Sequence, residues 1–325
     1  MKNEKMLFQK TVLPFIKWTF FPILVIFIAI FTYFYLFPPE SYEVEANLEG
    51  KKIAEAWKKL SNNRKGKVIY AQPPKMFILD LTRGLKKEVP NIVVTGGSGR
   101  MRRGNTPRPF WSPDGKKFIY RYDNNIYISN ENGNKRVIHN ELMDKSKETR
   151  WSWWNDEEGE WAVGPSKNRN IILVKISNPL ILRTVHKGGN VTKHCEITGN
   201  GKYLVYVYGR HIYLTRAWSH SPGKKISERQ ACRPCAAPDN RVAWLPAPHY
   251  AYIIHDAVNG KRMGELKAPE GEEIYRLNWS NDPDFAVHMF GSRGNTRIHV
   301  RKVSTGDNIF IGSGWDPDLW VEPGR

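Results

Sequence analysis

Short runs of alternating hydrophobic and polar residues recur along the chain from about residue 66 onward. Within residues 111–130, a Ser-Pro-Asp-Gly turn precedes the apolar run Phe118-Ile119-Tyr120, and a second alternating run follows at Asn125–Asn130. A period of two is typical of half-buried strands, and Ser, Pro, Asp and Gly favour tight turns. The pattern therefore predicts a pair of antiparallel strands that follows a turn.

This unit repeats at a nearly constant spacing. Equivalent turns align at Trp111, Trp154, Ile197, Ala236, Trp279 and Trp315, with successive offsets of 43, 43, 39, 43 and 36 residues. The later strand of the unit recurs from Lys75, Asn125, Ile171, His211, Tyr252 and Arg297. A period near 40 residues with several strands in each repeat is the signature of β-propeller blades. The sequence therefore predicts an all-β fold.

The two ends of the repeat region are complementary. The first later strand, near Lys75, has no turn before it, and the last turn, at Trp315, has no strand after it. Circular closure resolves this if Gly312 to Val321 supplies the inner strand of the blade whose outer strands begin at Lys67-Val-Ile-Tyr70, which also removes a free sheet edge. We therefore predict a six-bladed propeller over residues 67–325. A seventh blade remains an alternative if the tail forms a partial blade of its own.

The turn pattern resembles the TolB-like β-propeller repeat, a WD40-like repeat, over about residues 67–321. The residues that carry the match in the second unit are Pro109, Trp111, Ser112, Pro113, Asp114, Gly115, Ile119 and Tyr120. Other units depart from it, since Ile197-Thr-Gly-Asn-Gly has no Pro-Asp and Ala237-Pro-Asp-Asn lacks the Trp. The resemblance implies an exported, protein-binding propeller of the bacterial cell envelope. TolB itself is soluble and carries a further N-terminal α/β domain, whereas this chain has about 28 residues in that place.

The N-terminal region contains a predicted membrane anchor. Residues 18–37 are free of charge, and about 20 such residues cross a bilayer core. Four lysines precede the segment and three glutamates follow it: Lys2, Lys5, Lys10 and Lys17, then Glu40, Glu43 and Glu45. The positive-inside rule then places residues 1–17 in the cytoplasm and the propeller in the periplasm, as a single-pass protein of the bacterial inner membrane. A cleaved signal peptide is the competing interpretation, but it normally has a shorter apolar region and a small-x-small cleavage site.

Residues 38–66 are predicted to form a linker. Pro38-Pro39 ends the membrane segment. Apolar residues then recur at helical spacing, at Leu48, Ile53, Ala56, Trp57 and Leu60, which predicts a short amphipathic helix. The lysines of this helix, Lys51, Lys52, Lys58 and Lys59, either contact anionic lipid or form a solvated face.

The formal net charge of +18 favours anionic partners such as phospholipid head groups, acidic glycans or acidic protein surfaces; nucleic acid is not expected. The alternative is a solvated, lysine-rich surface. Three residues before the aligned turns stand Arg108, Trp151, His194, Arg233, Arg276 and Gly312, with Arg150 beside Trp151. Since inner strands line the axis of a propeller, we predict a basic ring at the channel mouth that binds an anion or a partner, made of Arg108, Arg150, His194, Arg233 and Arg276. The alternative is coincidence in a chain so rich in basic residues.

The three cysteines, Cys195, Cys232 and Cys235, are too few for a disulfide scaffold. The Cys-Arg-Pro-Cys motif lacks the following His of a haem attachment site, because Ala236 stands there, and it lacks the helix of a thioredoxin-like motif. A zinc site with His194 and Cys195, a disulfide from Cys195 to Cys232 or Cys235, and packed free thiols stay open.

No catalytic residues, metal site or cofactor are predicted. Gly96-Gly-Ser-Gly99 lacks the spacing of a nucleophile elbow. An aromatic cluster is formed by Trp151-Ser-Trp-Trp154 and Trp161, and its rings either stack on a sugar or belong to the core. The acidic loop Asp156-Glu-Glu158, beside Glu160, does not by itself make a cation site. The predicted function is a membrane-tethered, non-enzymatic binding or scaffold module for an envelope partner. A carbohydrate-active or other hydrolytic enzyme that uses the same face, and a structural accessory subunit of a membrane complex, are the alternatives.

Overall fold

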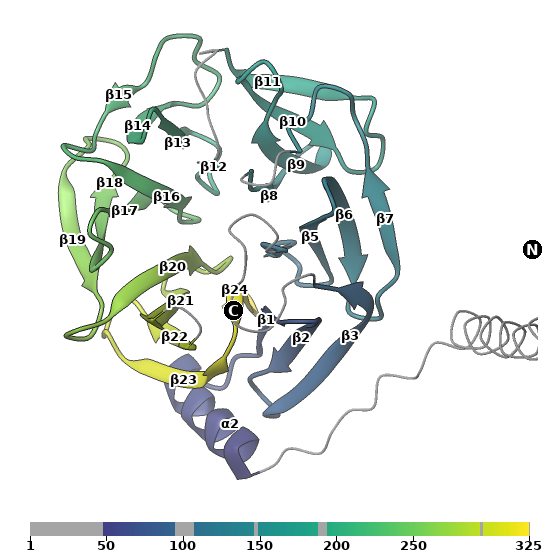
Figure 1. Cartoon of the computed structure of the whole chain (residues 1–325), viewed down its shortest axis with the longest axis vertical. Helices are drawn as coiled ribbons and strands as arrows, with labels where there is room; N and C mark the ends of the chain where they lie inside the picture. Colours follow the sequence, from purple (N-terminus) through teal and green to yellow (C-terminus); the bar gives the residue numbers. More distant parts are fainter. Residues whose placement is uncertain (1–47, 95–106, 146–148, 188–193, 293–294, 325) are drawn as a thin grey trace, which may run out of the picture. The chain divides into compact units, whose positions relative to one another are not determined.

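The computed structural model describes residues 48–94, 107–145, 149–187, 194–292 and 295–324. These residues form one helix and six four-stranded antiparallel sheets, which are arranged as blades around a common axis (Figure 1). The predicted all-β, six-bladed propeller is therefore confirmed. The predicted cytoplasmic stretch 1–17 and membrane segment 18–37 lie outside the described residues. Among the helices that are described, none has the length and apolar character to cross a membrane.

In each of the first three blades the strands run in order from the innermost to the outermost. The first contains β24 (Trp315–Val321), β1 (Gly66–Gln72), β2 (Lys75–Asp80) and β3 (Leu85–Val93). The second contains β4 (Phe110–Trp111), β5 (Lys117–Tyr122), β6 (Asn125–Asn130) and β7 (Lys135–Ile138). The third contains β8 (Ser152–Asp156), β9 (Gly159–Pro165), β10 (Ile171–Lys175) and β11 (Leu182–His186).

The remaining three blades follow the same order. The fourth contains β12 (Cys195–Ile197), β13 (Tyr203–Tyr208), β14 (His211–Arg216) and β15 (Lys224–Lys225). The fifth contains β16 (Ala231–Ala236), β17 (Arg241–Pro246), β18 (Ala251–Asp256) and β19 (Arg262–Lys267). The sixth contains β20 (Glu273–Trp279), β21 (Phe285–Ser292), β22 (Asn295–Lys302) and β23 (Asn308–Ser313).

The ring closes through the C-terminal strand, as predicted. Strand β24 pairs with β1 in antiparallel register, with Val321 opposite Gly66 and Leu319 opposite Val68. One boundary was wrong: Gly312 and Ser313 belong to the outer strand β23, so the closing strand begins only at Trp315. In the described part of the chain the tail completes the first blade, and the alternative of a seventh blade is not observed.

The turn of the second blade packs directly on the closing strand. Ser112 N donates to Lys117 O at 2.8 Å, and Gly115 adopts a φ of +67°. A Cβ atom at Gly115 would lie 2.4 Å from the indole of Trp320. Glycine is required here both by the left-handed backbone and by the close approach of the ring.

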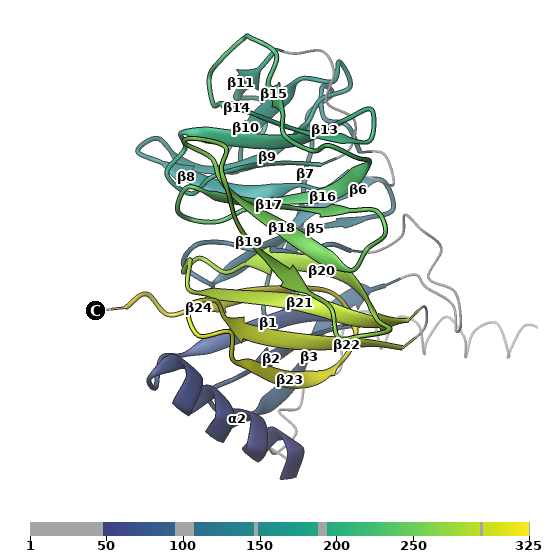
Figure 2. The same ribbon diagram turned by 90° about the vertical axis from the view of Figure 1, so that its left-hand side faces the viewer.

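Hydrophobic cores fill all six interfaces between neighbouring blades. The interface between the sixth and first blades has an additional cover, helix α2 (Leu48–Ser61), which lies in the linker where a short amphipathic helix is predicted. Its buried face, formed by Ile53, Trp57 and Leu60, packs against this core at one end of the molecule (Figures 1 and 2). The helix therefore covers the seam where the last blade meets the first, and strands β24 and β1 of the closing pair both contribute to the core of this seam.

Candidate functional site at the propeller axis

Charged side chains from the innermost strands and their flanks, and one from the second strand β5, meet near the axis. We call this set the axial cluster, and its members are Arg108, Arg121, Arg150, His194, Glu196, Arg233, Arg276, Asp316 and Asp318. Arg150, Glu196, Arg276, Asp316 and Asp318 are buried, and so is Arg121. Arg108, His194 and Arg233 are partly buried. Six of the nine side chains of the cluster are therefore buried within the ring.

Three carboxylates neutralise part of the positive charge. Arg150 Nη1 pairs with Glu196 Oε1, and Arg150 Nη2 lies 4.0 Å from Asp318 Oδ1. Arg276 Nη1 pairs with Asp316 Oδ1 at 3.1 Å. Five guanidinium groups face three carboxylates in the cluster, so its net charge is positive when all these groups are ionised.

Several nitrogen atoms of the cluster have no hydrogen-bond partner among the residues that the structure describes. These atoms are Arg150 Nε and Nη2, Arg233 Nη1 and His194 Nδ1. Buried donors without acceptors are costly, and each one needs an explanation such as stored strain or a bound anion. An anion with two or more oxygen atoms would satisfy such donors, because guanidinium groups match carboxylate and phosphate geometry.

The pKa values follow from burial among cations. Burial, followed by the charges of Arg108 and Arg276, lowers the pKa of His194 well below its ordinary value, so the imidazole is neutral at pH 7. Burial lowers the pKa of Arg108 to about 9, which leaves it cationic at that pH. Burial also raises the pKa of Asp318 to about 7, in spite of the opposing influence of Arg150.

Two carboxylates of the cluster also bridge neighbouring blades. Glu196 Oε2 accepts a hydrogen bond from Ala236 N of the fifth blade at 2.9 Å. Asp318 Oδ2 accepts one from Trp111 N of the second blade at 2.7 Å. These side chains therefore fix the inner strands relative to one another while their other oxygen atoms face the arginines.

Three cluster residues share an unusual backbone conformation. Arg108, Arg233 and Asp316 have φ values of 46°, 52° and 47°, and each is followed by a proline. Positive φ is uncommon for residues other than glycine, and such strain is concentrated at functional sites. The three Xaa-Pro steps turn the chain where the inner strands of the second, fifth and first blades face the axis.

The sequence predicted five members of this cluster, and the structure brings all five together. After burial, the charges of Arg108, Arg276, Arg150 and Arg233 lower the pKa of His194, as expected for side chains that lie near one another. Two other positions of the alignment do not join the site: Trp151 is buried in the core between the second and third blades, and Gly312 lies in β23.

Sequence reasoning missed the three carboxylates and Arg121. The error over Asp316 and Asp318 lies in aligning Trp315 with Trp111. Glu322 N donates to Lys65 O at 2.8 Å just as Ser112 N donates to Lys117 O, so Glu322 is the true counterpart of Ser112. The last repeat is therefore displaced by six residues from the alignment, and Asp318 takes the position assigned to Gly312. A constant offset of about 42 residues from the preceding turn at Trp279 would have placed the last repeat correctly and shown Asp318 at the axis.

The three cysteines are free in the structure, and the disulfide alternative is not observed. Cys195 is buried between the third and fourth blades, whereas Cys235 is buried between the fifth and sixth. Burial raises the pKa of both thiols, so they behave as packed apolar groups. Within the described residues, no group of three or more His, Cys, Asp or Glu side chains is placed to hold a metal ion.

The other candidate residues have structural contacts. Trp151, Trp153 and Trp161 are buried in inter-blade cores, as the core assignment expects. The acidic loop is ion-paired: Asp156 and Glu158 with Arg183, and Glu160 with Lys117. The glycine-rich loop at residues 96–99 lies outside the described residues.

Comparison with known proteins gives a match of structure. The sequence matches no family model and no curated protein sequence. The fold resembles TolB from Acinetobacter baumannii, with a TM-score of 0.57, 16% identity, and coverage of 79% of this chain and 66% of that chain. A putative TolB from Agrobacterium tumefaciens gives a TM-score of 0.53 at 12% identity, covering 79% of this chain and 98% of that chain. The likeness is one of fold.

A propeller from a different context is equally similar. A chain of the nidogen/laminin complex superposes with a TM-score of 0.55 at 9% identity, over 79% of this chain and 98% of that chain. The chain spans about two thirds of the length of the Acinetobacter TolB. Since one architecture carries unrelated activities, the function has to be argued from the axial cluster.

Proposed function

We propose that this protein is a non-enzymatic binding module, a β-propeller tethered to the bacterial inner membrane that binds an acidic group of an envelope partner at its axial cluster. The observation that carries this proposal is the excess of guanidinium groups over carboxylates, together with guanidinium donors on Arg150 and Arg233 that have no acceptor among the described residues. An acidic side chain or a chain terminus of a partner would supply both the missing charge and the missing acceptors.

The chemistry of the cluster favours binding over catalysis. Arginine stays protonated and does not serve as a general base near neutral pH. His194 is a weak base in this setting, because burial and the surrounding guanidinium groups lower its pKa. One of the structurally similar propellers belongs to a complex of two proteins, nidogen and laminin, which is consistent with a role in protein binding.

The tether is the uncharged segment at residues 18–37. In this proposal the lysine-rich residues 1–17 stay in the cytoplasm, and the propeller is exported to the periplasm, where it meets its partner. Tethering raises the effective concentration of the propeller at the membrane surface, which favours binding to a partner held at the same membrane.

The experiment uses the full chain in detergent with inorganic phosphate and succinate as probes. We expect each probe to raise the Tm relative to chloride at equal ionic strength, because a ligand that binds only the folded state stabilises it. Arg233→Gln should abolish the rise, whereas Arg229→Gln, an exposed arginine of the loop before the same blade, should retain it. A Tm in the unchanged protein that does not respond to either anion would overturn the binding site. Hydrolysis of a glycan or ester by the purified protein would overturn the non-enzymatic role.

A further inference from the structure

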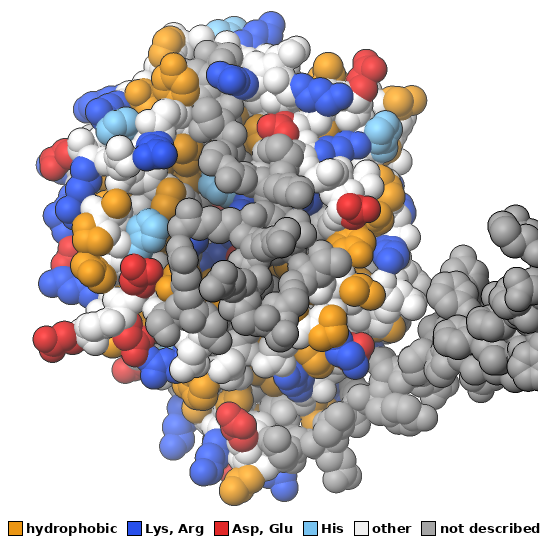
Figure 3. Space-filling model, in the orientation of Figure 1, with side chains coloured by type: hydrophobic (Ala, Val, Ile, Leu, Met, Phe, Trp, Pro, Cys, Tyr) orange, Lys and Arg blue, Asp and Glu red, His pale blue; other side chains and the backbone are white. Residues whose placement is uncertain are grey.

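Helix α2 has a lysine-rich face on the side opposite the propeller. Its exposed cations are Lys51, Lys52, Lys58 and Lys59. At 3.6 residues per turn these four fall on one face, and the buried Ile53, Trp57 and Leu60 fall on the other. Lys and Arg side chains border the lower edge of the molecule in Figure 3, where Figure 1 places α2.

The acidic residues of α2 are too few to neutralise the lysine face. Glu55 is the one acidic residue among the four lysines. Glu49 stands at the edge of the face, and its charge acts on Tyr70 and Lys86 of the first blade. Leu48, which is 71% exposed, lies on the lysine face at the beginning of the helix. A cluster of lysines close to a membrane segment is attracted to anionic lipid head groups.

The helix is locked in its rotation about its own axis. At its beginning the backbone touches the β2–β3 turn so closely that a Cβ atom at Gly84 would lie 2.0 Å from Gly50 O. At its end Trp57 Nε1 donates to Arg64 O at 2.7 Å, and a Cβ atom at Gly66 would lie 2.5 Å from the same indole. The helix cannot roll its lysines toward the propeller, so they are held facing outward.

We propose that this lysine face of α2 binds anionic phospholipid head groups and holds the propeller against the membrane; the inference rests on the tether of the proposed function. Ten residues separate Phe37 from Leu48, and even fully extended they span at most about 35 Å, so the helix stays near the bilayer. Each lysine close to an anionic membrane raises the docked population by roughly fivefold.

Lysine footprinting tests the proposal on the full chain in nanodiscs of neutral phosphatidylcholine and of the same lipid with phosphatidylglycerol. We expect the acylation rates of Lys51, Lys52, Lys58 and Lys59 to fall at least about threefold in the anionic discs and to recover in 1 M salt, where screening is nearly complete. The exposed Lys224 and Lys225 of the fourth blade are internal controls whose rates should not change. Equal rates for the α2 lysines in both kinds of disc would overturn the proposal.

A charge reversal separates lipid contact from a general effect of the disc. In K51E/K52E the remaining Lys58 and Lys59 should react at the same rate in both lipids, whereas K224E/K225E, with the same change in net charge, should keep the protection of α2. Protection that persists in K51E/K52E would contradict a charge-driven contact.

Failure of the chain to enter nanodiscs would instead remove the tether, and the inference with it. Protection of α2 only on addition of an acidic protein would assign the face to a protein partner and overturn the lipid proposal. Failure to enter nanodiscs would overturn the tether in both proposals. Every other outcome leaves the anion response of the axial cluster unchanged, so the lipid contact of α2 and the anion site fail separately.

Discussion

Asp318 Oδ1 lies 4.0 Å from Arg150 Nη2, and this pair links the closing strand β24 to the residues just before β8 of the third blade. The first and third blades are not neighbours in the ring, so the pair reaches past the second blade at the axis (Figure 1). Both side chains are buried, and Oδ1 has no hydrogen bond to any described residue. At this distance the arginine only partly offsets the cost of burying the carboxylate, which explains the raised pKa of Asp318.

Asp318→Asn should change how stability depends on pH. A carboxyl group whose pKa is raised to about 7 by folding stabilises the folded state at low pH, and this contribution is lost as the pH rises from about 4 to 7. The amide keeps an acceptor for Trp111 N but does not ionise. We therefore expect the free energy of unfolding of the variant to rise relative to that of the wild type as the pH rises, by up to about 4 kcal/mol at pH 8. Urea unfolding at pH 5, 6, 7 and 8 measures it.

The control for this change is Asp307→Asn, because Asp307 is exposed in the turn between β22 and β23. Its stability difference from the wild type should stay constant over the same pH range. If Asp318→Asn ran parallel to the wild type at every pH, Asp318 would not be the group that titrates. The same variant should also bind phosphate more tightly at pH 8, because it removes a competing negative charge from the axial cluster.

The buried imidazole of His288 should lower the free energy of unfolding in acid. This side chain is fully buried in the sixth blade, neither ring nitrogen has a hydrogen-bond partner in the described part of the chain, and the ring stacks on His299 at 5.6 Å. Burial lowers its pKa well below the ordinary value, with smaller contributions from His299 and Arg301. The unfolded chain therefore binds a proton below about pH 6.5 that the folded chain rejects, and stability falls as the pH drops through that range.

His288→Leu should flatten this decline. Leucine is similar in size and removes a buried polar group without a hydrogen bond, so we expect a gain of about 1–3 kcal/mol at pH 5 and a smaller one at pH 7.5. Urea midpoints across this range give the comparison, with the exposed His220→Leu as control. An unchanged slope in His288→Leu would show that another group causes the acid sensitivity.

The fold was predictable because its signals are local. The turn at residues 112–115 and the strands after it are specified within about 20 residues, and the phase of the repeats demands closure by the tail. The site was only partly predictable. Arg233 and Arg276 follow the repeat, whereas the place of Asp318 depends on a last repeat that lacks the turn sequence. The burial of the cluster also depends on packing across the whole ring, which no single repeat encodes.

Gly115→Ala tests the contact between the second blade's turn and the closing strand. Gly115 has a φ of +67°, and an added Cβ would lie 2.4 Å from the Trp320 ring. Gly260 has a nearly equal φ of +70°, with no atom within 4 Å of an added Cβ. Gly260→Ala should therefore cost about 1 kcal/mol, from backbone strain alone. Gly115→Ala should cost roughly 2–4 kcal/mol, because the clash is added to the strain. Equal losses in thermal or urea unfolding would show that Trp320 is free to move aside.

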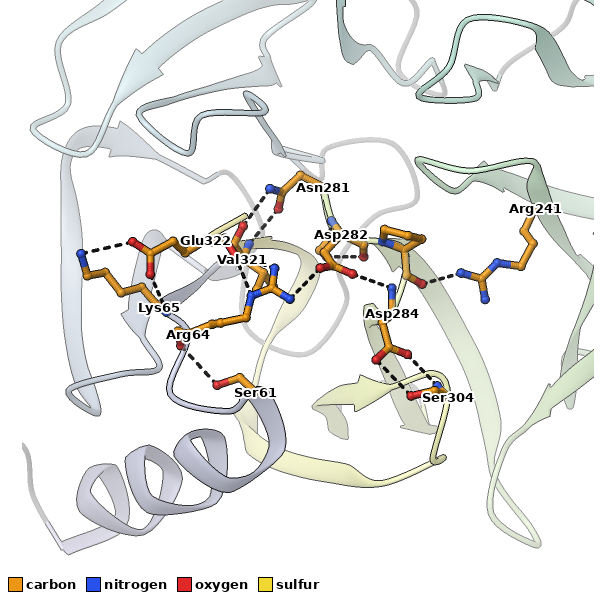
Figure 4. Close-up of polar contacts among 12 residues, drawn as sticks. Ser61, Arg64, Lys65, Arg241, Asn281, Asp282, Asp284, Ser304, Val321 and Glu322 are labelled. Atoms are coloured by element: carbon orange, nitrogen blue, oxygen red, sulfur yellow. Dashed lines mark hydrogen bonds and ion pairs between the residues drawn. The ribbon is translucent and has the colours of Figure 1, made fainter. Parts of the chain in front are cut away.

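Arg64 joins three parts of the chain at the seam that α2 covers, as Figure 4 shows. Its Nη1 pairs with Asp282 Oδ2 of the β20–β21 turn at 2.7 Å, and its Nε donates to Glu322 O, just after β24, at 2.7 Å. Arg64 therefore connects the end of the helix to both the last and the first blade.

Arg64→Ala should destabilise the closed ring by about 1.5–3 kcal/mol, the usual range for hydrogen bonds of a charged group. Because the lost contacts hold the tail, cleavage after residue 312 by a protease should speed up along with the fall in the urea midpoint. Arg83→Ala is the matched control: Arg83 pairs with Asp80 within one turn and is largely exposed, so its loss should cost less than about 0.5 kcal/mol. A fall in stability with no change in tail cleavage would mean that Arg64 stabilises the linker and not the closure, since only opening of β24 from β1 exposes the tail.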